Sequence, residues 1–148
     1  MEKFAFILHP LSLQDMEHLS PLMRYIPDPI IEACLKMKKP FKVSHITGIK
    51  SPYAEAEGWF IGCPLTAKQM VELPEEFVMD RIIESGKVAQ ELGAKIVGLG
   101  AFTSIVGDAG ITVAKNLDIA VTSGNSYTVA PGADVLCQNR RRFPGVRC

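Results

Sequence analysis

Three short apolar runs, each followed at once by polar residues, constrain the fold of this chain more than any other feature. The runs cover residues 4–8, 95–99 and 119–122, and a helical pattern over 110–116 links the last two. Apolar runs without alternation are typical of strands that are buried on both faces. Right-handed crossovers place the carboxyl ends of successive parallel strands on the same side. The pattern therefore predicts parallel strands whose polar followers gather at one edge of a sheet.

The rest of the chain predicts further elements of both kinds. Ser12 can cap a short helix, and Pro29 opens another that extends to Met37. Residues 41–50 and 58–63 are β-like and predict a hairpin or two neighbouring strands. A long amphipathic stripe begins at Pro74 and ends at Gly93, with Gly86 inside it. We expect an α/β fold in a single domain, with a mixed, largely parallel sheet and helices on both faces.

Composition limits the class of protein. The chain has 148 residues, of which 47% are hydrophobic and 22% charged, which suits one globular core. No apolar stretch reaches the roughly 20 residues of a membrane span, and the first residues lack the basic start of a secretory signal. Lys plus Arg and Asp plus Glu both number 16, so the chain has no excess of positive charge for a phosphate backbone. We therefore expect a cytoplasmic protein without a membrane span that binds no nucleic acid.

The last residues differ from those before them. Residues 131–148 contain four arginines against one aspartate, together with prolines and glycines and no helical stripe. The predicted organisation is thus an α/β domain over residues 1–130 and an irregular basic tail over 131–148. A frame shift or a truncation of a longer enzyme explains such a change.

The candidate site residues are neutral groups that follow the three apolar runs, where open α/β sheets bind their ligands. They are His9, Ser12, Thr103, Ser104, Gly124, Asn125, Ser126 and Thr128. Helix capping by Ser104 and a capping turn around Gly124 remain as structural alternatives. No carboxylate pair, catalytic Ser/His/Asp set, Cys/His dyad or zinc spacing accompanies these residues. The pattern therefore favours binding over catalysis by this chain alone.

Two other features have a competing structural explanation. Gly98 and Gly100 follow an apolar run as in a dinucleotide-binding turn, but Thr103 stands where the third glycine would be. A complete nucleotide-binding domain is therefore a weaker hypothesis than a glycine-rich turn. Cys63 ends a β-like run, and a buried, unreactive thiol is the common role of such a cysteine. We expect it to be better protected than Cys137 and Cys148.

Residues 4–13, 98–105 and 122–128 resemble the N-terminal domain of shikimate-dehydrogenase-like oxidoreductases. The bacterial predicted amino acid dehydrogenases and the long-chain acyl-carrier-protein reductases are the most similar members. The resemblance implies a substrate-side domain that is followed by a Rossmann domain holding NAD or NADP. The nucleophilic cysteine of the aldehyde-forming members lies in that later region, so none of the four cysteines here matches it. The family pattern is lost from Val129 onward.

The leading hypothesis is therefore the substrate-binding domain of an NAD(P)H-dependent oxidoreductase that acts on a carbonyl, acyl or amino-acid-like substrate. Without its cofactor domain, the chain should bind no cofactor tightly and should be inactive alone. The alternative is a free-standing module that binds a small molecule or a protein without catalysis. Surface left by a missing cofactor domain also makes a homo-oligomer plausible.

Overall fold

A computed structural model of the chain describes residues 2–10 and 25–124. Its elements in chain order are β1 (Glu2–Leu8), α2 (Asp28–Met37), β2 (Phe41–Lys50), β3 (Glu55–Gly62), α3 (Ala67–Glu72), α4 (Glu75–Glu91), β4 (Ile96–Leu99), the 3-10 turn η2 (Ala101–Ser104), α5 (Ile111–Lys115) and β5 (Ala120–Thr122). The helix expected after Ser12 and the tail over residues 131–148 lie outside the described residues.

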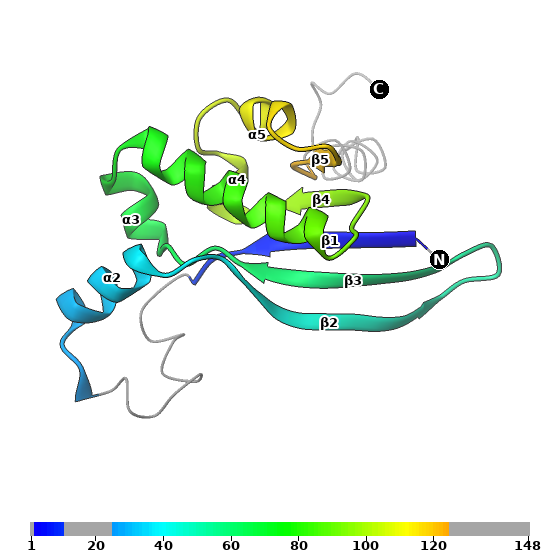
Figure 1. The fold of residues 1–148 in the computed structure, drawn as a ribbon, viewed down its shortest axis with the longest axis horizontal. Helices are drawn as coiled ribbons and strands as arrows, with labels where there is room; N and C mark the ends of the chain where they lie inside the picture. Colours follow the sequence, from blue (N-terminus) through cyan, green and yellow to red (C-terminus); the bar gives the residue numbers. More distant parts are fainter. Residues whose placement is uncertain (1, 11–24, 125–148) are drawn as a thin grey trace, which may run out of the picture.

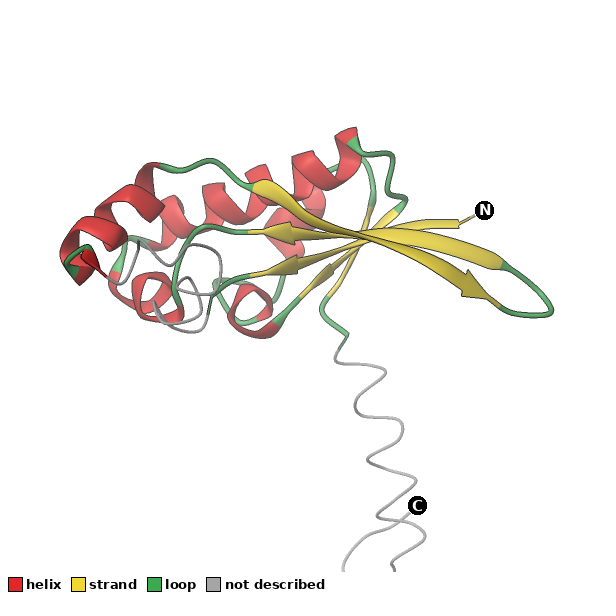
Figure 2. Ribbon diagram, turned by 90° about the horizontal axis from the view of Figure 1, so that it is seen from below, coloured by secondary structure: helices red, strands yellow, loops and turns green. Residues whose placement is uncertain are grey.

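The strands form one five-stranded sheet in the order β2-β3-β1-β4-β5. β1 pairs in parallel with β3 and with β4, and β4 pairs in parallel with β5. β2 joins the edge as the antiparallel partner of β3, which confirms the predicted hairpin. Figure 2 shows the strong twist of the sheet and the hairpin that extends beyond the other strands. The predicted α/β fold with a mixed, largely parallel sheet is therefore confirmed.

The main core lies between the sheet and α4, which runs across it (Figure 1). Its strand residues include Ala5, Ile7, Val97 and Leu99, all of which are buried. The predicted stripe of α4 supplies Val78, Ile82, Ile83 and Ala89. α2, α3 and α5 all contact α4. None of the helices in the described ranges is long and apolar enough to cross a membrane.

Gly86 in the middle of α4 has a packing reason. A Cβ built at this position would lie 2.4 Å from the Leu117 Cδ1 atom. The glycine therefore lets the segment after α5 approach the helix closely. This contact accounts for a residue that costs about 1 kcal/mol relative to alanine in a helix interior.

One expectation needs correction. Residues 119–122 were expected to form a buried strand, but β5 is an edge strand in which Ala120 and Thr122 are exposed. Among the described residues, α4 and α5 pack on the face of the sheet that includes Ile7 and Leu99, and Phe6 and Leu8 on the opposite face are partly exposed.

The sequence analysis also missed α3. Its N-cap is Thr66, whose hydroxyl accepts a hydrogen bond from the backbone N–H of Gln69 over 3.2 Å. The Gln69 side chain in turn accepts from the backbone N–H of Thr66 over 3.1 Å. This reciprocal pair is a capping box, and a threonine three residues before a glutamine is its sequence signal.

Candidate functional site

Four of the eight predicted site residues lie at the carboxyl edge of the sheet, after three neighbouring strands. His9 follows β1, the turn η2 follows β4, and Gly124 lies two residues after β5. Because β1, β4 and β5 are adjacent and parallel, their carboxyl ends lie on the same side. The expected parallel arrangement of these strands is thus confirmed. Ser12, Asn125, Ser126 and Thr128 lie outside the described residues.

The strand order adds a topological reason for a crevice at this edge. After β1 the next elements in the chain are α2, β2 and β3, and these two strands lie on one side of β1 in the sheet. After β4 the chain continues to α5 and β5, and β5 lies on the opposite side, beyond β4 (Figure 1). The connections that leave the neighbouring strands β1 and β4 therefore diverge. In open α/β sheets, ligands bind at such a switch point, outside the carboxyl ends of the strands.

The side chains at this edge are held by local hydrogen bonds. The His9 Nδ1 atom lies 3.1 Å from the Pro10 carbonyl oxygen. The buried Thr103 hydroxyl donates to the Gly100 carbonyl over 2.7 Å, and the Thr103 backbone N–H donates to the same oxygen over 3.1 Å. Thr103 therefore stabilises the turn, and its hydroxyl proton is already engaged. Ser104 is half-buried beside it.

Gly124 closes a second turn at the same edge. Its φ of +75° is in the left-handed region that favours glycine. Its backbone N–H donates to the Thr122 hydroxyl over 3.1 Å. This arrangement is the compact polar turn that the sequence predicted after the last strand.

Gly98 and Gly100 do not form an open phosphate-binding turn. A Cβ at Gly98 would lie 2.6 Å from Phe6 Cδ2, and one at Gly100 would lie 2.6 Å from Phe6 Cε1 and 2.7 Å from the Ile7 carbonyl oxygen. The close packing of Phe6 and of the β1 backbone therefore gives both glycines a structural reason, which is the alternative that the sequence left open for this turn.

Cys63 stands at the carboxyl end of β3, beside the same edge. Its backbone N–H donates to the Leu8 carbonyl over 2.8 Å, and its side chain is buried. Loss of solvation on burial raises the pKa of the thiol to about 11, although a hydrogen bond with Ser85 opposes the shift. The thiol is therefore protonated at neutral pH and is a poor nucleophile. Cys63 is therefore buried, whereas Cys137 and Cys148, with which its protection was compared, lie outside the described residues.

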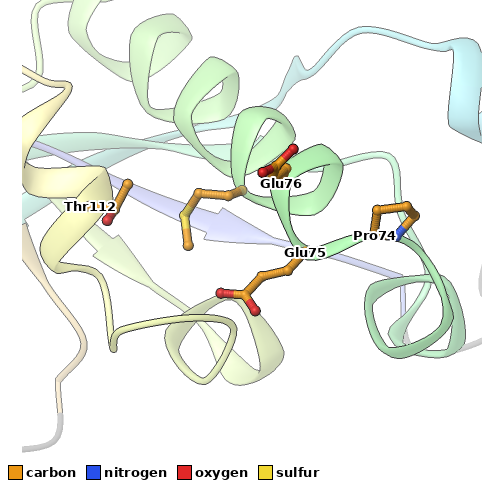
Figure 3. A pocket seen from close by; sticks show the side chains of 5 residues that line it. Pro74, Glu75, Glu76 and Thr112 are labelled. Carbon is orange, nitrogen blue, oxygen red and sulfur yellow. The ribbon is translucent and has the colours of Figure 1, made fainter.

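A pocket of about 470 Å³ lies between the start of α4 and α5, and the sequence analysis did not identify it. Its lining residues are Pro74, Glu75, Glu76, Met79 and Thr112. Figure 3 shows Glu75 and Thr112 on the two sides of this space. α4 follows β3 and α5 follows β4, so both helices begin near the carboxyl edge. The pocket therefore lies toward the same end of the sheet as the carboxyl ends of the parallel strands.

The rim of this pocket is acidic. The Asp108 carboxylate accepts hydrogen bonds from the Thr112 backbone N–H over 3.0 Å and from its hydroxyl over 2.7 Å. These bonds lower the pKa of Asp108 below its ordinary value. Gly107 has a φ of +68°, and a Cβ there would lie 2.5 Å from Met79 Cε. The sequence signals for this pocket are the Asp108–Thr112 spacing and the acidic first turn of α4, which contains Glu75.

The described residues contain no group of three or more His, Cys, Asp or Glu side chains that could hold a metal ion. Neutral hydrogen-bonding groups follow the strands at this edge, and the carboxylates of Glu75 and Glu76 line the pocket between α4 and α5. Such groups can orient a carbonyl, amide or ammonium group.

No protein family model matches the chain. Among characterised proteins, Aminotransferase PigE from Serratia sp. (strain ATCC 39006) is 37% identical to it over 97 residues. The matched residues make up 66% of this chain but only 11% of that protein. The chain is thus similar to a small part of a much longer protein.

Proposed function

We propose that this chain is the substrate-side α/β domain of a larger enzyme, an NAD(P)H-dependent oxidoreductase that acts on a carbonyl, acyl or amino-acid-like substrate. One observation carries the proposal. The parallel strands β1 and β4 end side by side at a switch point, where His9 and the η2 turn are positioned. Such an edge is where α/β domains hold small ligands.

The chemistry of this edge supports binding and orientation of a substrate. An imidazole such as that of His9 and a hydroxyl such as that of Ser104 can each donate a hydrogen bond to a carbonyl oxygen or accept one from an amine. The acidic rim formed by Glu75 and Glu76 favours a positively charged amino group. The buried Cys63 thiol is protonated at neutral pH and is a poor nucleophile, and the packing of Phe6 against Gly98 and Gly100 gives that turn a structural role. Under this proposal the hydride donor is held by another domain.

The similarity to an aminotransferase supports the substrate class rather than the reaction. Aminotransferases act on amino and carbonyl groups, which are the groups that this edge can recognise. The matched stretch makes up 11% of that protein, so most of its machinery lies elsewhere. The same similarity is compatible with a domain that contributes binding to a multidomain enzyme. A free-standing binding module is the competing function.

Nuclear magnetic resonance titration of the purified chain tests the proposal. The ligands are a short aldehyde, an acyl thioester of N-acetylcysteamine, a neutral amino acid and NADPH. We expect at least one of the first three to shift the amide signals of His9, residues 100–104 and Gly124, and NADPH to shift none of them. Shifts confined to other regions, or NADPH binding at Gly98, would contradict the proposal.

A pair of serine variants sharpens this test. Ser104→Ala removes a hydroxyl at the proposed edge, whereas Ser44→Ala removes an exposed one on β2. Loss of a hydrogen bond to the substrate should weaken binding about tenfold in the first variant, which is about 1.4 kcal/mol. The second should bind like the original chain. Turnover when a separate cofactor domain is added would distinguish an enzyme domain from a free-standing module.

A further inference from the structure

The helix α2 carries two apolar stripes, of which only one is buried. Ile31 and Leu35, one turn apart, are 6% and 3% exposed. The second stripe has the spacing i, i+3, i+4 and i+7, and we name it the outer stripe; its members, all exposed, are Ile30, Ala33, Cys34 and Met37. Met37 is 81% exposed. Because apolar residues at this spacing normally pack against a partner, the outer stripe indicates a surface for interaction.

Residues outside the outer stripe hold α2 in place. The Gln69 Nε2 atom on α3 donates to the Glu32 carbonyl over 2.9 Å, and the Lys68 ammonium lies 3.4 Å from the Glu32 carboxylate. Toward the end of the helix, the Arg81 guanidinium on α4 donates to the Lys36 carbonyl over 3.1 Å. The outer stripe is therefore presented on a helix whose position is set by other residues.

Four lysines accompany the outer stripe, and we name them the lysine cluster. They lie within one short segment at the end of α2 and the start of β2, and they are Lys36, Lys38, Lys39 and Lys42. All four are exposed, and none forms an ion pair with another residue of the ranges 2–10 and 25–124. The acidic residues of α2 lie elsewhere, since Asp28 is in its first turn and Glu32 contacts Lys68.

Aromatic rings position two of these ammonium groups. The Lys38 Nζ atom lies 4.1 Å from the centroid of the Phe41 ring, and the Lys36 Nζ atom lies 5.5 Å from that of Phe77. A cation–π contact orients a charge without cancelling it. The lysine cluster therefore keeps its positive charge next to an exposed apolar stripe.

We infer that the outer stripe and the lysine cluster together bind the surface of an anionic lipid bilayer. Interfacial helices combine an apolar face, which enters the boundary between headgroups and acyl chains, with lysines that contact anionic headgroups. A nucleic acid would account for the lysines and leave the outer stripe exposed to water. A bilayer accounts for both features, because its acidic headgroups border an apolar interior. The inference goes beyond the proposed function and does not depend on it.

Flotation of the full chain with lipid vesicles tests this surface. One set of vesicles contains phosphatidylcholine alone, and the other contains phosphatidylcholine and phosphatidylglycerol in equal amounts. Lys38→Gln combined with Lys39→Gln removes two charges of the lysine cluster. The matched control combines Lys50→Gln with Lys95→Gln, which removes two charges that are each paired with a glutamate elsewhere in the domain. Circular dichroism establishes that each variant is folded.

Two further measurements address the outer stripe. Met37→Gln makes it more polar, and the control is Tyr53→Gln, because Tyr53 is 97% exposed in the turn between β2 and β3, at the other end of the molecule from α2 (Figure 1). In a chain with serine at positions 137 and 148, a nitrobenzoxadiazole label on exposed Cys34 reports whether the stripe enters the bilayer.

Each lysine near an anionic surface strengthens binding about fivefold. We therefore expect binding to the anionic vesicles alone, lowered at least about tenfold by the substitutions at Lys38 and Lys39 and about threefold by Met37→Gln. Both control variants should bind within about twofold of the original chain. The fluorescence of the label on Cys34 should rise when anionic vesicles are added.

Four results would each overturn the inference. They are no binding to anionic vesicles, equal binding to both kinds of vesicle, an equal loss in the lysine variant and its control, and unchanged fluorescence at Cys34. A stripe that instead meets an acidic protein or residues 11–24 would give the first result. Binding through the arginines of residues 131–148 would leave the lysine variant and its control alike.

Discussion

Alanine substitutions at Gly98 and Gly100 should lower stability to different extents, because different atoms oppose the new methyl group. At Gly98 the nearest atoms belong to the Phe6 ring, which is 37% exposed and can move outward. At Gly100 the backbone carbonyl of Ile7 also lies within 2.7 Å of the new Cβ and cannot move without distorting β1. Gly100→Ala should therefore be the more harmful change.

The magnitudes follow from two opposing effects. An extra methylene in a packed site costs about 1 to 3 kcal/mol, whereas alanine gains about 0.5 to 1 kcal/mol over glycine in a strand. We expect Gly98→Ala to lower the free energy of unfolding by no more than about 1 kcal/mol. Gly100→Ala should lower it by about 1 to 3 kcal/mol, because one of the two atoms nearest to the new methyl group is the Ile7 backbone carbonyl oxygen, which cannot move aside.

Urea unfolding followed by circular dichroism measures these changes, both alone and in a Phe6→Ala background. Removal of the ring should abolish the cost at Gly98, with a coupling energy of about 1 kcal/mol in the double-mutant cycle. It should leave most of the cost at Gly100. If Phe6→Ala relieved both substitutions equally, or if Gly100→Ala were harmless, the packing explanation of this glycine pair would be wrong.

Three further predictions concern single groups. At pH 8 iodoacetamide should label exposed Cys34 at least about tenfold faster than Cys63, because burial raises the pKa of the Cys63 thiol to about 11. Mass spectrometry measures the two labelling rates, and equal rates would refute this prediction. Thr66→Ala should lower the free energy of unfolding by about 1 kcal/mol because it removes the N-cap of α3, and an unchanged urea midpoint would contradict it. Hydrogen bonds from Thr112 lower the pKa of Asp108 below its ordinary value, so their stabilisation is present at neutral pH and is lost as the pH falls through this lowered pKa. Asp108→Asn should therefore differ from the original chain in stability at pH 7 and differ less at pH 3, whereas a constant difference would exclude this linkage.

The sequence predicted those elements whose pattern is local. The apolar runs ended where proline or glycine follows, and the stripe between Pro74 and Gly93 became α4 almost to the residue. The parallel order of β1, β4 and β5 followed from the length of the connecting helix and the handedness of crossovers. In these cases neighbouring residues and general chain geometry decide the structure, and no distant contact is needed.

The features that the sequence did not reveal depend on distant contacts. Gly98 and Gly100 resembled part of a nucleotide motif, but the reason for their small size is the ring of Phe6, more than 90 residues away in the chain. The pocket beside α4 needs Thr112 to stand opposite Glu75, and nothing in either segment indicates this. The exposure of β5 depends on what lies beside it in the sheet. Periodicity cannot supply such information.

The two surfaces of this domain follow from one property of its topology. Because β1 is central, its outgoing chain leads toward α2 while the chain from β4 leads toward α5, and this divergence opens the carboxyl edge near His9. The crossovers from β3 to β4 and from β4 to β5 run in the same direction, so the handedness rule places α4 and α5 on the same face. The same connections therefore leave the carboxyl ends of β1 and β4 between diverging segments and leave the Phe6 side of the sheet without α4 and α5. The proposed function places the ligand at these strand ends.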